Sequence, residues 1–391
     1  MGEFCVYFPK TLYRRLVIFY IYAVQLNKII SRIRGDSKTV GLDIGHRLIR
    51  VAVVGHRQGS KRTLLALEHD TLPEGIVVDN EIRNVSVLID KIRALLSRAM
   101  PGGIEGDFVV SVNWTSGILC DRILVKPVPK VPENELILQA AMGRSPFDDA
   151  GNVLDYFVLG NREEGIEAMI VAAKKDSLSP WVNMFQALNL RLFAIDVDAF
   201  VLSNMYFASK TRSLSEPPPE EDDDAVLLLN LGYKKSYAAF LRNERFSAAR
   251  SITGGSVQEL QEQLSSSLGI SAEQCGELLI GADTRQSGLD MSKIKDTMEY
   301  IFEEIAMKVD TALRYFSSSD NYRVPSKMIV AGGGSNIVNL IPFLANRLSL
   351  DVVRLNPFNS VQIDKKRFFG INWDREASIY TVALGLALRR F

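Results

Sequence analysis

Three short glycine-containing segments each follow an apolar run that is typical of a buried strand. They read Asp43-Ile-Gly, Asn230-Leu-Gly and Gly332-Gly-Gly. Glycine lets the backbone turn back sharply, so that its N–H groups point at an anion, and it also lets a flat ring approach the backbone. A carboxylate such as Asp43 can hold Mg²⁺ through water. Together the order and spacing of the segments favour a site for an anion and a flat ring, although one glycine run by itself is usually only a tight turn.

The elements around the first two segments follow the same pattern. Residues 38–45 and 48–54 are predicted to form a strand, a glycine turn and a returning strand. Residues 225–232 and 236–241 repeat this order about 190 residues later, and 246–252 is a further strand. A repeat of one supersecondary unit predicts two similar half-domains that face each other.

The remaining pattern alternates strands and helices. Apolar residues at helical spacing, such as those in 84–99, predict helices, and short apolar runs bounded by turns predict strands. The predicted strands are 63–67, 107–112, 155–159, 167–173, 191–197 and 327–330. The predicted helices are 84–99, 133–142, 177–190, a helix to about 209, 256–268, 271–280, 293–317 and 336–348.

Composition excludes several functional classes. The chain has 391 residues, enough for two or more domains, and its 46 basic residues balance 46 acidic ones. A zero net charge argues against nucleic acid as the main partner. Its cysteines are too far apart for a disulfide framework, and its histidines are too isolated for a zinc site: Cys5, Cys120 and Cys275, with His46, His56 and His69.

Two segments are expected to lie outside the folded core. Residues 1–37 are basic and amphipathic, and their longest apolar run, Leu16 to Val24, is too short to span a membrane. They are either a helix on an anionic membrane surface or the product of a mis-assigned start codon, and the sequence leaves both open. Residues 213–224 combine prolines with consecutive acids and predict a solvated loop.

The order of the three glycine turns resembles the phosphate-1, phosphate-2 and adenosine loops of the actin-like ATPase superfamily. Within it, residues 38–391 resemble the family of type IV pilus assembly protein PilM, which is related to the division protein FtsA. The resemblance is carried by Val40-Gly-Leu-Asp-Ile-Gly, Leu159-Gly through Val171-Ala-Ala-Lys-Lys, Ala194-Ile-Asp-Val-Asp-Ala-Phe, Leu229-Asn-Leu-Gly through Ile252-Thr-Gly-Gly, Ile329-Val-Ala-Gly-Gly-Gly-Ser-Asn through Leu340-Ile-Pro, and Leu355-Asn-Pro-Phe.

The resemblance implies an α/β, actin-like fold: duplicated ribonuclease H-like lobes flank a cleft. Residues 38–212 would form the first lobe and 225–391 the second. Ser145-Pro-Phe and Val153-Leu-Asp-Tyr resemble part of the small α+β subdomain that PilM and FtsA insert into the first lobe, here at about 105–175.

Departures from the superfamily pattern weaken the expected nucleotide site. Hydroxyl residues and a lysine usually follow the first Asp-x-Gly, but His46, Arg47, Leu48 and Arg50 stand there, and Asn230 replaces a metal-orienting aspartate. Gly276 and Leu279 stand where a glutamate and a lysine usually meet the nucleoside. Each missing charge-assisted hydrogen bond removes ~1.5–3 kcal/mol, and several together approach the ~8 kcal/mol of a micromolar ligand.

We therefore expect no cofactor, or only weakly bound ATP and Mg²⁺. If the site were active, Asp43 and Asp198 would be the catalytic candidates, and Asp43 would hold the metal. The degenerate nucleotide-binding set is Asp43, Gly45, His46, Arg47, Asn230, Gly232, Gly332, Gly333 and Gly334.

For a PilM-like protein, the resemblance implies a cytoplasmic scaffold at the inner membrane with little or no ATP hydrolysis. A groove would bind the N-terminal tail of a PilN-like bitopic protein, with indirect links to a PilO-like protein and the pilus motor ATPases. Its wall candidates are Leu136, Ala140, Ser145 and Phe147, whose apolar members equally suit the core of the subdomain. The alternatives are an FtsA-like membrane-tethered filament protein, a GspL-like type II secretion component and an active actin-like ATPase.

Overall fold

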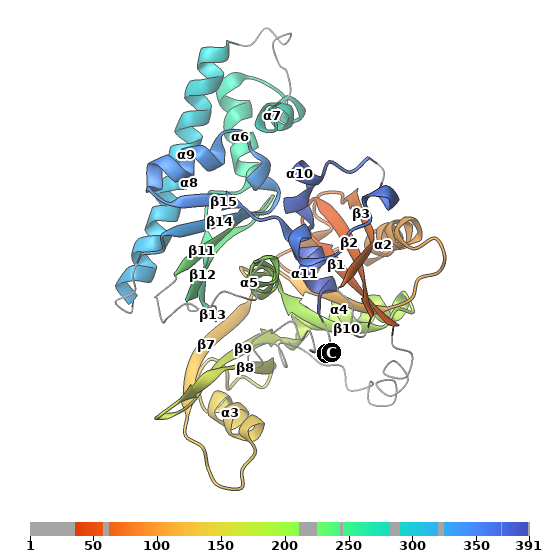
Figure 1. The fold of residues 1–391 in the computed structure, drawn as a ribbon, viewed down its shortest axis with the longest axis vertical. Helices are drawn as coiled ribbons and strands as arrows, with labels where there is room; N and C mark the ends of the chain where they lie inside the picture. The colour runs from red at the N-terminus through yellow and green to blue at the C-terminus, as the bar shows by residue number, and fades with distance from the viewer. Residues whose placement is uncertain are drawn as a thin grey trace, which may run out of the picture. The chain divides into compact units, whose positions relative to one another are not determined.

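The computed structural model describes residues 36–57, 62–210, 225–242, 245–281, 290–319, 324–368 and 370–389. They form two compact units, shown in Figure 1. The first unit contains the residues up to Val201 together with 361–369 and 382–391. The second unit contains residues 202–360 and 370–381. The predicted amphipathic stretch (apart from its last two residues) and the predicted acidic loop lie outside the described residues.

The first unit is built on a five-stranded mixed sheet of order β10-β6-β1-β2-β3. β1 pairs antiparallel with β2, which pairs antiparallel with β3, whereas β6 is parallel to both β1 and β10. The central strands are almost continuously apolar and buried because the sheet is covered on both faces. The strands are β1 (Asp36–Ile44), β2 (Leu48–Arg57), β3 (Thr63–Thr71), β6 (Asp107–Val112) and β10 (Leu192–Val197).

The second unit repeats this topology strand for strand. Its sheet has the order β13-β12-β11-β14-β15, in which β11, β12 and β13 form an antiparallel meander and β14 and β15 are parallel to β11. The duplication predicted from the two glycine turns is therefore present. The strands are β11 (Val226–Leu231), β12 (Ser236–Arg242), β13 (Arg245–Ile252), β14 (Lys327–Ala331) and β15 (Asp351–Arg354).

Helices complete the cores, and none in the described part of the chain is long and apolar enough to cross a membrane. In the second unit α6, α8 and α9 gather beside the sheet (Figure 1) and bury Leu264, Ile305 and Leu344. The helices are α2 (Val85–Ala99), α4 (Lys175–Ala187), α5 (Asp198–Ser209), α6 (Val257–Leu268), α7 (Ala272–Leu279), α8 (Met291–Ser319), α9 (Leu340–Leu348), α10 (Trp373–Glu376) and α11 (Thr381–Ala387), with a short hairpin of β4 (Val77–Val78) and β5 (Glu81–Ile82).

A small α+β subdomain projects from the first unit. Its antiparallel sheet has the order β7-β9-β8, and helix α3 packs on one face over a separate apolar core. The strand β6 belongs to the main sheet, so the insertion begins near residue 118 and not at about 105 as predicted. The elements are β7 (Ile118–Val125), α3 (Glu133–Met142), β8 (Asn152–Arg162) and β9 (Gly165–Lys174).

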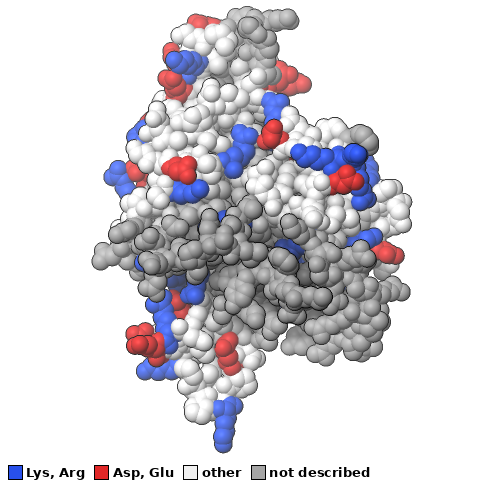
Figure 2. Space-filling view, in the orientation of Figure 1, with Lys and Arg blue, Asp and Glu red and all other residues white. Residues whose placement is uncertain are grey.

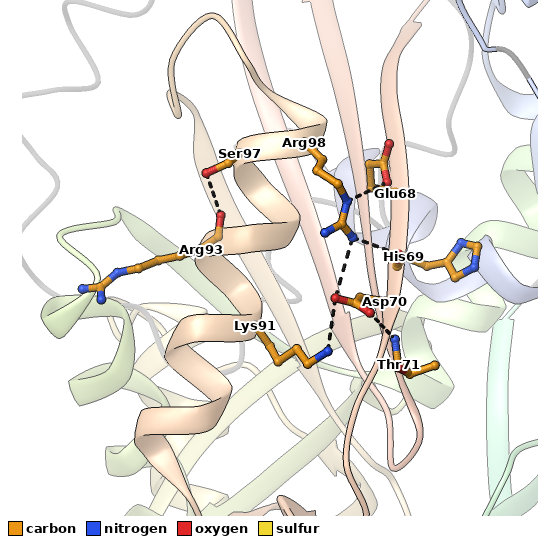
Figure 3. A network of polar contacts seen from close by, with 8 residues as sticks. All are labelled: Glu68, His69, Asp70, Thr71, Lys91, Arg93, Ser97 and Arg98. Carbon is orange, nitrogen blue, oxygen red and sulfur yellow. Dashed lines mark hydrogen bonds and ion pairs between the residues drawn. The ribbon is translucent and has the colours of Figure 1, made fainter.

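Helix α2 is attached to the edge strand β3 by polar side chains (Figure 3). Lys91 Nζ lies 3.3 Å from Asp70 Oδ2, and Arg98 donates to the carbonyl of His69 at 3.2 Å. Arg98 also lies within 3.5 Å of Glu68. These groups are partly exposed, so each pair contributes less than about 1 kcal/mol. Their charges also protect an edge strand from pairing with other chains.

The predicted boundary between two contiguous lobes was wrong at the C-terminus. Helix α11 packs against the first sheet at Gly41, where a Cβ atom would lie 2.0 Å from the carbonyl oxygen of Ala383. Just beyond it, Arg389 Nε lies 2.8 Å from Asp196 Oδ2 at the end of β10. The final residues therefore complete the first unit, although they follow the second along the chain.

We predict that Arg389→Ala lowers the free energy of unfolding by about 3–5 kcal/mol, because it leaves the fully buried carboxylate of Asp196 without its counter-ion. Chemical denaturation followed by circular dichroism measures the change. Arg98→Ala removes an exposed arginine from the same unit and serves as the control, with an expected loss below about 1 kcal/mol. Equal losses in the two variants would contradict the importance of the buried pair.

Candidate functional site

The first glycine turn is held by a cross-strand ion pair. Asp43 and Arg50 are directly opposite in the β1–β2 register, and Arg50 Nη1 donates to Asp43 Oδ2 at 2.7 Å. The N–H of Gly45 bonds to the carbonyl of Leu48 at 2.9 Å and closes the turn. His46 is half-buried and Arg47 is exposed. In the sequence, Arg50 was a departure from the superfamily pattern. In the structure it is the ion-pair partner of Asp43, the residue that was expected to hold a metal ion.

Asp198 lies near Asp43 but is held by structural contacts. Its Oδ1 accepts the backbone N–H of Trp114 at 2.7 Å, and its Oδ2 accepts Asn113 Nδ2 at 2.9 Å. Asn113 follows β6 directly, and its own N–H bonds to the side chain of Asn80 at 2.7 Å. The sequence prediction missed Asn113, although a polar residue after a buried parallel strand is the signal that identified Asp43.

Burial raises the pKa of all three acids in this region. It raises the pKa of Asp198 to about 8, where the Trp114 N–H acts in the opposite direction and the charges of Asp43 and Asp196 add to the rise. Burial also raises the pKa of Asp43 and Asp196, against the opposing charges of Arg50 and Arg389. Asp198 is therefore mostly protonated at neutral pH.

The second and third glycine turns meet within the second unit. Asn230 on β11 pairs in register with Ala331 on β14, so the turns that follow these parallel strands lie side by side. A Cβ atom on Gly332 would lie 2.7 Å from Asn230 Oδ1, and one on Gly232 would lie 2.2 Å from the carbonyl oxygen of Lys235. Both glycines are thus required by packing inside the unit, with no ligand needed to explain them.

Helix α6 begins beside the second turn, but its first amides are already bonded. The N–H groups of Val257 and Gln258 donate to the carbonyls of Gly232 and Tyr233 at 3.0 and 2.9 Å. The N–H of Glu259 donates to Ser256 Oγ, and the Glu259 carboxylate accepts the N–H of Ser256 in return. A helix N-terminus binds phosphate through free N–H groups, and this one instead presents a carboxylate.

The third turn is also tightly packed. A Cβ atom on Gly334 would lie 2.6 Å from the Cβ of Leu231, whereas Gly333 faces open space. Leu279 lies in the apolar core, and its carbonyl accepts the N–H of Val338 at 2.9 Å. Leu279 therefore has a structural role at the position where relatives would present a charged residue to the nucleoside.

These groups do not fit a magnesium–triphosphate complex bound in the way that the resemblance implies. Asp43 is neutralised by an arginine, Asn230 carries no charge, and the first turn of α6 is already satisfied. Among the described residues, no group of three or more His, Cys, Asp or Glu side chains could hold a metal ion. The predicted residues cluster as two sets, one in each unit.

The predicted groove residues mostly contribute to the subdomain's own core. Phe147 is 4% exposed in this core, and Leu136 and Ala140 of α3 pack against the same core. Ser145 is exposed and precedes a cis peptide bond to Pro146. Phe147 therefore needs no partner to cover it. The exposed large apolar residues of the subdomain are Leu124, Val128 and Met142.

Comparison with known proteins gives matches over nearly the whole chain. A family described as "Type IV pilus assembly protein PilM" matches residues 41–391. A solved structure entitled "PilM-PilN type IV pilus biogenesis complex" is similar, with a TM-score of 0.72 and 23% identity over 90% of this chain and 98% of that one.

Two other solved structures share the fold at lower identity. Ethanolamine utilization protein EutJ from Carboxydothermus hydrogenoformans has a TM-score of 0.52 and 13% identity over 90% of each chain. A diol dehydratase-reactivating factor in nucleotide-free form has a TM-score of 0.53 and 10% identity over 90% of this chain and 99% of that one. The predicted actin-like α/β fold is confirmed.

We predict that Asp198→Asn flattens the pH dependence of stability. The folded chain holds a proton at Asp198 up to a pKa of about 8, whereas the ordinary value is 3.8, so the free energy of unfolding falls as pH rises between these values. This one group contributes a slope of up to ~1.4 kcal/mol per pH unit, which the amide removes.

Denaturation at several pH values between 5 and 8, roughly the window in which one extra proton is bound, measures the slope. Asp90→Asn changes an exposed aspartate of α2 and is the control that keeps the original slope. Identical slopes for Asp198→Asn and the unmodified chain would show that Asp198 is charged in the folded state.

Proposed function

Because the chain belongs to the type IV pilus assembly protein PilM family, we propose that it is a cytoplasmic scaffold at the inner membrane. It binds the N-terminal tail of a PilN-like bitopic protein and links this protein, and indirectly a PilO-like protein, to the pilus motor ATPases. The observation that supports this most strongly is the fold match over 90% of the chain to a structure in which a PilM protein is combined with PilN.

The subdomain offers two exposed apolar side chains near the edge strand β7 for such a tail. Leu124 is 47% exposed on the sheet face away from α3, where it lies opposite Glu167, which pairs with Arg122 at 3.7 Å. Val128, just beyond β7, is 48% exposed. An extended apolar peptide covers such residues and can add to the edge of β7 as a further strand. The tail therefore contacts Leu124 and Val128, while Phe147 supports the sheet from within.

ATP hydrolysis is weak or absent in this proposal. The Asp43 carboxylate is paired with Arg50, Asn230 supplies no negative charge for a metal, and α6 offers no free amide in its first turn. Asp198, the candidate for orienting water, is buried and is held in place by the N–H groups of Trp114 and Asn113 that its oxygens accept. The protein keeps the fold of a nucleotide-binding family and uses it to dock partners.

We predict that a peptide with the sequence of the PilN-like N-terminal tail binds without added nucleotide. Leu124→Asp and Val128→Asp place a charge under the apolar tail and weaken binding by about tenfold or more, roughly 1.4 kcal/mol. Fluorescence anisotropy of a labelled peptide measures the affinity.

Met142→Asp is the matched control, because Met142 is 54% exposed in the same subdomain but lies at the end of α3. It should leave the affinity unchanged. A tail that binds only with magnesium-ATP, or that binds Leu124→Asp normally, would contradict the proposal.

We also predict that fluorescent ATP with Mg²⁺ gives no saturation in the micromolar range. Restoring a charge with Asn230→Asp should strengthen binding only slightly, because the amides of α6 remain occupied. Titration of both proteins and a phosphate-release assay check this. Micromolar binding with steady turnover by the unmodified chain would identify an active ATPase instead.

A further inference from the structure

We infer that Arg50 takes the place of a divalent cation beside Asp43, so that the first glycine turn is closed to metal ions by a residue of the chain itself. This inference rests on the proposed loss of nucleotide chemistry and is independent of partner docking.

The geometry of the hairpin fixes the ion pair. Asp43 and Arg50 are opposite each other in neighbouring strands, so the backbone register alone brings the side chains together. The two side chains are only 14% and 15% exposed, and Arg50 Nη1 lies 2.7 Å from Asp43 Oδ2. The same Nη1 atom would lie 3.4 Å from a Cβ on Gly45, which shows that the guanidinium folds back over the turn.

An arginine in this position keeps its positive charge. The guanidinium group remains protonated at any physiological pH, so it competes with a cation under all conditions. A metal ion at Asp43 would have to displace Arg50 and leave its charge nearly buried and unpaired, which is strongly unfavourable. The Nε atom of Arg50 is also buried without a hydrogen-bond partner in the described residues, so Asp43 is its main support.

The charges around the turn are balanced without a metal ion. Asp43 forms an ion pair with Arg50, and Asp196 forms one with Arg389. The oxygens of Asp198 accept neutral N–H groups. A hydrated divalent cation binds where negative charge is in excess. Removal of Arg50 would create such an excess at Asp43, beside the buried Asp198.

Mn²⁺ binding, followed by the electron paramagnetic resonance signal of the free ion, tests the inference. The unmodified protein and Arg50→Lys should leave the ion free, because both retain a cation opposite Asp43. Arg50→Ser should bind Mn²⁺ at least about tenfold more tightly than the unmodified chain, a difference of ~1.4 kcal/mol. The double variant Asp43→Asn/Arg50→Ser should lose this gain.

Two results would overturn the inference: Mn²⁺ binding by the unmodified chain that disappears in Asp43→Asn, or no gain of binding in a folded Arg50→Ser. Thermal melts establish folding, and Arg50→Gln is the second variant if Arg50→Ser does not fold. If neither Arg50 variant folds, Mn²⁺ binding by the unmodified chain compared with Asp43→Asn still tests the inference. Fluorescence anisotropy of the tail peptide, measured on the same variants, tests the scaffold proposal separately. Leu124 and Val128 are unchanged in these variants, so the affinity for the peptide should also be unchanged.

Discussion

Parallel pairing of the central strands determines where the polar residues of this protein meet. Strands that run in the same direction end at the same edge of a sheet, so residues that are far apart in sequence become neighbours there. In the first unit this brings Asn113 after β6 to Asp198 after β10. In the second it brings Asn230 to Gly332. The direction of the strands therefore determines which residues meet at each candidate site, and the chemistry of those residues determines what the site can bind.

Much of the fold could be predicted from the sequence because its strands and helices have clear periodicity. The helix 133–142 and the strand 107–112 have the predicted bounds, and the repeated hairpin correctly indicated a duplicated sheet. The strand β7 was missed, because its alternation is interrupted by polar and charged residues such as Asp121 and Arg122. The start of the inserted subdomain was also misplaced, since the predicted range 105–175 included β6, which belongs to the main sheet.

The candidate site was predicted less completely, because residue type does not reveal what a side chain contacts. Asp43 and Asp198 were identified as candidates, but their partners Arg50 and Asn113 come from pairing between strands. The glycines were correctly placed in turns, yet Gly334 is explained by the nearby Leu231 and not by a ligand. Phe147 could be read equally as groove or core, and only burial places it in the core.

The return of the C-terminal segment to the first unit has a consequence for how the protein is made. Helix α11 covers Gly41, and Arg389 neutralises Asp196, so both groups depend on residues that are synthesised after the second unit. Domains usually mature in the order of synthesis. Here the first unit cannot be completed until the second unit and helix α11 have been synthesised, so the region of Gly41 lacks its covering helix during that time. A chain truncated before α11 would therefore lose packing in the unit whose first strands were synthesised earliest.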